Sequence, residues 1–176
     1  MSTTLPRGIR NGNPLNIRYV GRNKWQGRIL SKDKKDRQFE EFVGFDYGFR
    51  AAFILIHKYI TAHKCNTVRK LISRWAPAQE NDTENYIRTV CYRACMPEDT
   101  ELDFCNGHQM FNLVSEMTWM ECGQYLSLHD MARGYVMACE SLNVQPHWCM
   151  DDLQSRAYYI EKRLYEKQKW EENENL

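Results

Sequence analysis

No run of about 18 consecutive apolar residues occurs in this 176-residue chain. A helix that crosses a bilayer needs about 20 such residues, so no membrane span is predicted. The first residues, Met-Ser-Thr-Thr-Leu-Pro-Arg, also lack the apolar core of a secretory signal peptide. We therefore expect cytoplasmic synthesis, and any role outside the cytosol would depend on delivery by another component.

An excess of charge of either sign is also missing. Lys and Arg number 24 and Asp and Glu 23, which leaves a net charge of +1. A nucleic-acid partner would call for a basic excess or a basic face, so none is predicted. The 43% hydrophobic content is typical of a soluble globular protein. We expect one domain over residues 1–150 and a C-terminal helical extension over residues 151–176.

Motifs for metals, nucleotides and serine nucleophiles are absent. The seven cysteines contain no C-x-x-C, and His147 lies two residues before Cys149. No metal site is predicted, and the cysteines are interpreted as buried thiols in a reducing cytosol. No Walker or Rossmann glycine loop and no G-x-S-x-G elbow occur, so no cofactor and no serine nucleophile are expected.

The N-terminal quarter is rich in Gly, Asn and basic residues. Residues 7–18 contain Gly8, Gly12 and Pro14, which predicts a shaped loop rather than a helix. Three segments after it have strand-like composition, and Trp25-Gln26-Gly27 suits a hairpin turn. We predict a small β-hairpin or sheet from residues 16–20, 25–30 and 38–42.

From residue 43 onward the apolar residues repeat at helical spacing. The first helical stretch ends near residue 60, and later helices have N-cap candidates at Asn66, Asn81 or Asp82, Asn106 and Ser127. A last helix is predicted from about residue 151. The expected class is therefore α+β and mostly helical, with about six helices after the small sheet.

Glu121 is the most informative position for chemistry. The apolar stripe of its helix contains Met110, Val114 and Met117, and the next step of four reaches Glu121. Burial and the negative end of the helix dipole would both raise the pKa of this carboxyl, as a general acid near neutral pH requires. The alternatives are that the helix end frays into solvent or that Glu121 pairs with an arginine such as Arg133.

Other carboxylates have ordinary structural interpretations beside the catalytic one. Glu80 and Asp82 lie at the start of a predicted helix, where acidic side chains cap free amides. Asp46 opens the first long helix, where the helix dipole favours a carboxylate.

Several motifs together resemble a bacteriophage and prophage family whose members are labelled virion or structural proteins. The family shows G-I-R-N-N-N-P-G-N-I-R followed by W-Q-G, and in pattern it is similar to lysozyme-like peptidoglycan hydrolases. The matching segments are residues 7–18, 24–27, 39–42, 46–51, 66–68, 73–77, 80–83, 86–87 and 120–123.

The resemblance implies a lysozyme-like fold and a phage-derived enzyme of lysozyme or lytic-transglycosylase type that cleaves the glycan of peptidoglycan. Glu121 would act as the acid, with Asp46, Glu80, Asp82 or the substrate's acetamido group stabilising the oxocarbenium ion. A non-catalytic virion structural or assembly protein, with other virion proteins as partners, is the alternative. The predicted substrate-binding residues are Arg10, Asn11, Asn13, Asn16, Trp25 and Tyr47.

Overall fold

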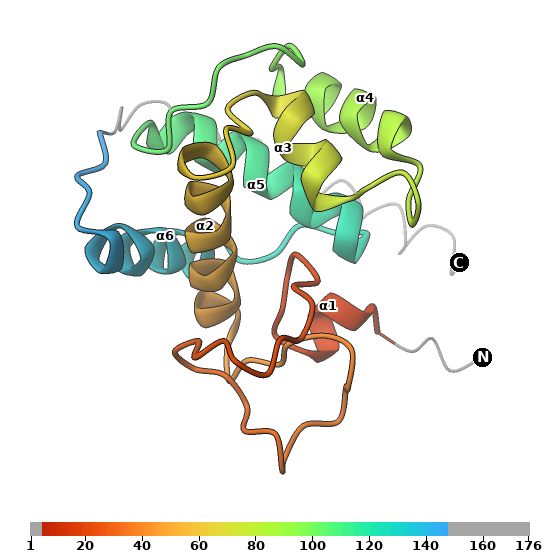
Figure 1. Ribbon diagram of the computed structural model, residues 1–176, viewed down its shortest axis with the longest axis vertical. Helices are drawn as coiled ribbons and strands as arrows, with labels where there is room; N and C mark the ends of the chain where they lie inside the picture. Colours follow the sequence, from red (N-terminus) through yellow and green to blue (C-terminus); the bar gives the residue numbers. More distant parts are fainter. Residues whose placement is uncertain (1–4, 148–176) are drawn as a thin grey trace, which may run out of the picture.

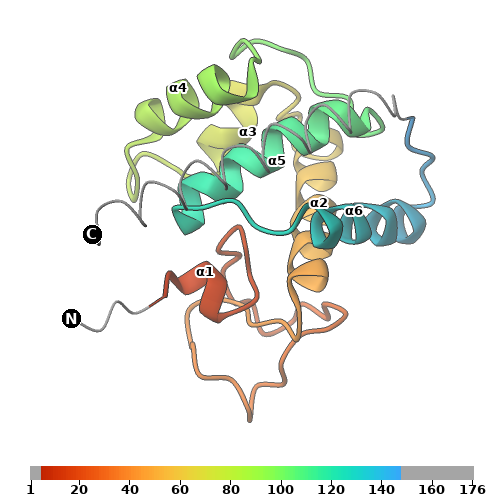
Figure 2. The same cartoon turned by 180° about the vertical axis from the view of Figure 1, so that it is seen from behind.

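The computed structural model describes residues 5–147, and six helices account for its regular structure there (Figures 1 and 2). Helix α2 packs across α6, α4 packs against α3 and α5, and the short α1 lies against α5. In Figure 1 the irregular segment between α1 and α2 lies below the group formed by α3, α4 and α5. The helices are α1 (Arg7–Arg10), α2 (Phe45–Thr61), α3 (Val68–Trp75), α4 (Thr83–Ala94), α5 (Gly107–Cys122) and α6 (Leu128–Leu142).

Helix α2 supplies the centre of the core. Its residues Phe49, Phe53 and Ile56 are fully buried, as the helical spacing of the apolar residues predicts. Phe53 packs against the Tyr135 ring of α6 with ring centroids 4.9 Å apart. Gly134 lets α6 approach α2 closely, because a Cβ atom there would lie 2.7 Å from the Asp46 carbonyl oxygen and 2.8 Å from the Arg50 nitrogen.

Short polar side chains begin four of the helices. Thr67, Asp82, Asn106 and Ser127 each accept a hydrogen bond from the backbone N–H three residues later. The caps predicted at Asp82, Asn106 and Ser127 are confirmed. The cap of α3 is Thr67 and not Asn66, one residue later than predicted.

The predicted β-hairpin or sheet, and with it the lysozyme-like α+β class, is wrong. Residues 5–147 contain no strand, and the predicted strand segments meet only at the isolated bridges Arg18–Phe39 and Arg28–Phe42. The segments do run extended, with hydrogen bonds from Tyr19 N to Gln38 O and from Ile29 N to Glu41 O, both 2.8 Å. Each pairing has one further bond, from Glu40 N to Ile17 O at 2.8 Å and from Val43 N to Gly27 O at 2.9 Å, so no ladder forms.

Residues 7–18 also depart from the prediction at their start, because Arg7–Arg10 forms the single turn of α1. Glu40 and Glu41 are adjacent in the predicted strand 38–42, where neighbouring side chains would face opposite sides, and both are buried. The helix predicted from residue 151 and the proposed extension over 151–176 lie outside the described residues. Within residues 5–147, none of the helices combines the length and the apolar character that crossing a bilayer requires.

Candidate functional site

A cleft of about 630 Å³ lies between the N-terminal segment, α2 and the end of α3. Its lining brings together segments that are distant in the sequence, including parts of five of the segments that carry the resemblance. Glu121, in the last turn of α5, is the α5 residue in this lining. The other lining residues are Leu15, Asn16, Ile17, Arg18, Val20, Asn23, Phe39, Leu55, Tyr59, Arg74, Trp75, Ala76, Pro77, Glu80 and Asn81.

Glu121 is held by one hydrogen bond on each carboxylate oxygen. Asn16 donates from Nδ2 to Oε2 at 2.8 Å, and the Tyr86 hydroxyl donates to Oε1 at 3.1 Å. Burial raises the pKa of the Glu121 carboxyl above its ordinary value, while the two hydrogen bonds act in the opposite direction. Burial has the larger effect, so the protonated form is favoured relative to a carboxyl in water.

Tyr86 belongs to α4 and is almost fully buried. Burial, followed by the nearby charge of Glu121, raises the pKa of its hydroxyl well above the ordinary value. The hydroxyl therefore stays protonated and donates. The alternative pairing of Glu121 with Arg133 is not observed, because Arg133 lies 3.4 Å from an Asp46 oxygen.

The loop that presents Asn16 is built around the fully buried Asn13. The Asn13 amide donates to the carbonyls of Ile17 and Glu40, both at 3.0 Å, and its oxygen accepts from Ile17 N at 2.9 Å. Asn16 has a φ of 48°, in the left-handed region that Asn tolerates better than most residues. The sequence composition of this loop thus fixes the direction from which the Asn16 amide reaches Glu121.

The same loop is fastened to the end of α5. The Cys122 thiol donates to the Pro14 carbonyl at 3.3 Å. Burial and the neighbouring Glu121 charge raise the pKa of this thiol to about 12, so it remains a donor. Gly8 makes the close approach possible, because a Cβ atom there would lie 2.8 Å from the Cys122 sulfur.

Charged and aromatic side chains form the cleft walls. Arg18 pairs with Glu80, and its guanidinium lies 5.3 Å from the centre of the Phe39 ring. Arg74 lies 4.8 Å from the centre of the Tyr59 ring, which meets Trp75 edge-on at 5.9 Å. The cleft therefore offers ring faces and cations near the partly buried carboxyl of Glu121.

Of the four predicted catalytic carboxylates, Glu121 and Glu80 line the cleft. Asp46 and Asp82 are not among its lining residues. Asp46 accepts from Tyr47 N and pairs with Arg133 of α6, and Asp82 caps α4 by accepting from Asn85 N at 3.1 Å. Both therefore fill the structural roles that their positions at helix starts allow.

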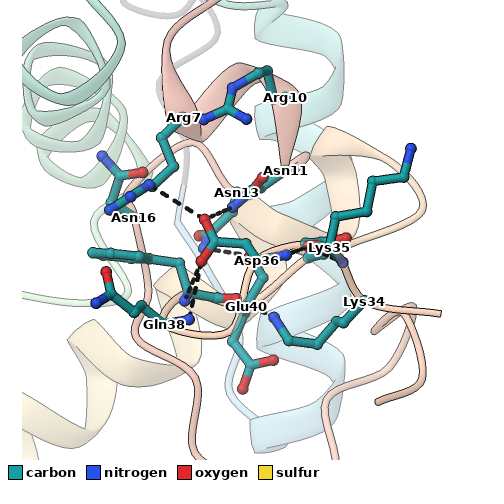
Figure 3. A network of polar contacts seen from close by, with 12 residues as sticks. Arg7, Arg10, Asn11, Asn13, Asn16, Lys34, Lys35, Asp36, Gln38 and Glu40 are labelled. Atoms are coloured by element: carbon teal, nitrogen blue, oxygen red, sulfur yellow. Dashed lines mark hydrogen bonds and ion pairs between the residues drawn. The ribbon is translucent and has the colours of Figure 1, made fainter. Parts of the chain in front are cut away.

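Asn16 alone of the six predicted substrate-binding residues lines the cleft. In Figure 3, Arg7 and Asn11 turn toward Asp36, while Arg10 points away from it. The Asn11 amide donates to Asp36 at 3.0 Å, and Arg10 donates to the Leu5 carbonyl at 3.1 Å. The Asn13 side chain makes its hydrogen bonds to Ile17 and Glu40, as described above.

Trp25 and Tyr47 are partly buried against the core and are likewise absent from the lining. Tyr47 packs on Gly27, where a Cβ atom would lie 2.2 Å from the tyrosine ring. The predicted turn at Trp25-Gln26-Gly27 thus serves a close packing contact, for which Gly27, at φ of 71°, is required.

The sequence analysis did not identify Tyr86 as a partner of Glu121, nor Tyr59, Arg74 and Trp75 as residues of the cleft wall. Tyr86, Arg74 and Trp75 belong to motifs of the resemblance, so a signal was present, but nothing in their spacing assigns them to one cleft. Tyr59 carried no signal apart from its place in an amphipathic helix.

The described residues hold no group of three or more His, Cys, Asp or Glu side chains arranged to bind a metal ion. Glu116 of α5 is fully buried and does not line the cleft. Arg93 lies 2.7 Å from it, and the Tyr125 hydroxyl donates to it at 2.9 Å. Any acid chemistry of the site therefore depends on Glu121, which is partly buried, has a raised pKa and lines the cleft.

Comparison with known proteins gives one relationship. The chain is similar to Protein P5 of Pseudoalteromonas phage PM2, with 36% identity over 126 residues, which cover 70% of this chain and 76% of that protein. No protein-family model matches the chain.

Proposed function

Given that this chain belongs to the phage protein family of Protein P5 of Pseudoalteromonas phage PM2, we propose that it cleaves the glycan strand of peptidoglycan with Glu121 as general acid. The observation that carries the proposal is the environment of Glu121, a carboxyl with a raised pKa that lines a cleft and receives a hydrogen bond on each oxygen. A general acid must hold its proton near neutral pH and still reach a substrate, and the raised pKa and the place in the cleft act in these two directions.

In the proposed reaction the Glu121 carboxyl gives its proton to the glycosidic oxygen. The bond between that oxygen and the anomeric carbon breaks, and its electron pair stays on the departing oxygen. The positive charge that develops on the sugar must then be stabilised by a neighbouring electron pair. Glu121 is left as a carboxylate, which the Asn16 and Tyr86 hydrogen bonds stabilise.

The second carboxylate of the cleft, Glu80, forms an ion pair with Arg18. An ion-paired carboxylate is a poorer nucleophile and a weaker base than a free one, because the cation stabilises its negative charge. We therefore assign the stabilising role to the acetamido oxygen of the substrate. The sugar's own primary hydroxyl then attacks the anomeric carbon, and the electron pair that the acetamido oxygen shared with that carbon returns to the oxygen. The hydroxyl proton passes to Glu121, which gives an anhydro product and restores the acid.

The test is turbidity loss of purified peptidoglycan with mass analysis of the released fragments. We expect the native chain to release anhydro muropeptides, lighter by one water than hydrolysis products, and Glu121→Gln to lose at least about 99% of this activity. Glu140→Gln makes the same chemical change on the exposed face of α6 and should behave as the native chain. Equal activity of native chain and Glu121→Gln would refute Glu121 as the acid.

A second candidate function is a non-catalytic component of a virion, and the observation in its favour is the relationship to a phage protein. Its partners would be other virion proteins, and the cleft would bind without cleaving. This candidate predicts a folded native chain that leaves peptidoglycan intact and co-purifies with virions. Glycan cleavage by purified protein would exclude it.

A further inference from the structure

We infer that Arg74 is the residue by which the cleft recognises a carboxylate on the substituents of its glycan. This inference rests on the proposed function and deepens it, because it separates a carboxylate-bearing strand from a neutral polymer of N-acetylated sugars. Carboxylates of peptidoglycan come from two sources, the peptide stems and the lactyl group that is freed when a stem is removed.

The ring of Tyr59 orients Arg74, which has no ion-pair partner among residues 5–147. It is exposed in the last turn of α3, and its guanidinium lies over the Tyr59 ring. Across residues 5–147 no carboxylate forms an ion pair with it. A planar guanidinium that rests on an aromatic face keeps its N–H groups available for a carboxylate, and less side-chain freedom is lost on binding.

The other arginine of the cleft differs in this respect. Arg18 is already neutralised by Glu80, so a ligand carboxylate would have to displace an existing partner. Arg10, the arginine among the predicted substrate-binding residues, does not line the cleft. Arg74 is therefore the cleft cation with an unmet preference for an anion.

The surroundings of Arg74 add to the positive field. Lys58 lies in the last turn of α2. Loss of hydration and the positive charges of Arg74 and Lys58 lower the pKa of His63, whose ring meets Tyr59 at 5.8 Å. Arg74 and Lys58 thus both act on the ring that contacts Tyr59, and their positive charges favour an anionic group beside Arg74, although Lys58 and His63 do not line the cleft.

The test measures binding by intrinsic fluorescence, to which Trp75 contributes from within the cleft. Three soluble ligands are titrated into the full-length chain: peptide-bearing glycan strands, the same strands after amidase has removed the stems, and neutral chito-oligosaccharide. Glu121→Gln serves as the background, so that no ligand is consumed. Arg74→Gln should weaken binding of at least one carboxylate-bearing ligand about ten-fold and leave chito-oligosaccharide binding unchanged. Whichever strand is affected identifies the source of the carboxylate.

Arg74→Lys keeps the charge but not the planar fork, and we expect an intermediate loss. Arg88→Gln removes one positive charge from an exposed position on α4 outside the cleft lining and should change nothing. Equal weakening for neutral and anionic ligands, no weakening, or no binding of any strand would each overturn the inference. Arg74-dependent binding by a native chain that cleaves nothing would uphold it while refuting the proposed reaction.

Discussion

Tyr86 and Asn16 stabilise the ionised form of Glu121, so each lowers the pKa that burial raises. Tyr86→Phe removes one of these bonds and keeps the ring. We expect the pKa of Glu121 to rise further, which moves the alkaline limb of the pH–activity profile to higher pH because the acid must be protonated to act. Carboxyl-carbon NMR titration of the folded protein measures the same shift without relying on activity.

The matched control is Tyr135→Phe. The Tyr135 hydroxyl is also buried, but it donates to the Phe104 carbonyl at 2.6 Å, and Tyr135 is not a lining residue of the cleft. Its removal should cost stability and leave the Glu121 titration in place. A Glu121 pKa that stays constant or falls in Tyr86→Phe would contradict the assigned role of Tyr86.

Glu121 also affects stability. Because burial raises its pKa in the folded state, the folded protein binds a proton more tightly than the unfolded chain does. The penalty for ionising it is absent below the unfolded pKa and grows as pH rises through the folded pKa. Glu121→Gln removes this penalty, so its melting temperature should exceed the native value by a few degrees near neutral pH.

The gain in melting temperature should depend on pH, which distinguishes it from a change in packing. Melts at about pH 8 and about pH 3.5 bracket the ordinary glutamate pKa. The advantage of Glu121→Gln should shrink at the acid end, where both proteins carry a neutral side chain. A gain that is the same at both pH values would show that ionisation is not its cause, and Glu140→Gln should show no gain.

For single residues, the sequence predicted that Glu121 faces inward with a raised pKa, because it continues the apolar stripe of its helix. Its side chain is partly buried and its pKa is raised. The sequence did not allow the predicted sugar-binding residues to be separated from structural ones. Asn11 and Asn13 have the same chemistry as Asn16, yet the loop turns their amides toward Asp36 and the backbone. Which amide faces the cleft depends on tertiary docking.

Among the elements, α2 and α6 meet most closely at Gly134. A methyl group there would lie 2.6–2.8 Å from atoms of Phe49, Asp46 and Arg50, two of which are backbone atoms that cannot turn aside. We expect Gly134→Ala to lower the free energy of unfolding by about 2 kcal/mol, since overpacking outweighs the better helix propensity of Ala. Urea unfolding followed by circular dichroism gives the value.

Gly21→Ala is the control for this variant. The nearest heavy atom to its added methyl would be the Tyr19 hydroxyl at 3.8 Å, so stability should change by less than about 0.5 kcal/mol. An unchanged or higher stability of Gly134→Ala would mean that the two helices separate at little cost.

The five helices α2 to α6 were predictable because each has its own apolar period and most have a polar cap. The lack of a sheet in residues 5–147 was not predictable, because short segments of alternating polar and apolar residues resemble strands wherever they occur. Whether they form a ladder depends on the turns between them, and here the glycines and asparagines serve packing contacts such as that of Gly27 with Tyr47. The turn of α1 escaped prediction because four residues carry no period.

In the whole molecule, Arg93, Glu116 and Tyr125 join α4, α5 and the segment before α6. Glu116 is fully buried, and burial together with its charge raises the pKa of Tyr125 to about 12. Arg93→Met removes the cation beside a buried carboxylate, which should cost about 3 kcal/mol or more. The denaturant midpoint measures this loss.

The double variant Arg93→Met/Glu116→Leu removes both charges and should recover most of the lost stability, because two apolar side chains of similar volume replace a buried ion pair. A double variant that is less stable than Arg93→Met would show that Glu116 contributes more through its other contacts than through the pair.

The hydrogen bond between Asn16 and Glu121 joins residues 105 positions apart in the chain. Since synthesis proceeds from the N-terminus, the loop that carries Asn16 leaves the ribosome long before the acid that it orients. A nascent chain shorter than 121 residues lacks the acid, and a fragment that begins after residue 16 lacks the amide that orients it. Under the proposed function, the producing cell is thereby spared from truncated products, because latency is a property of the topology and needs no inhibitor.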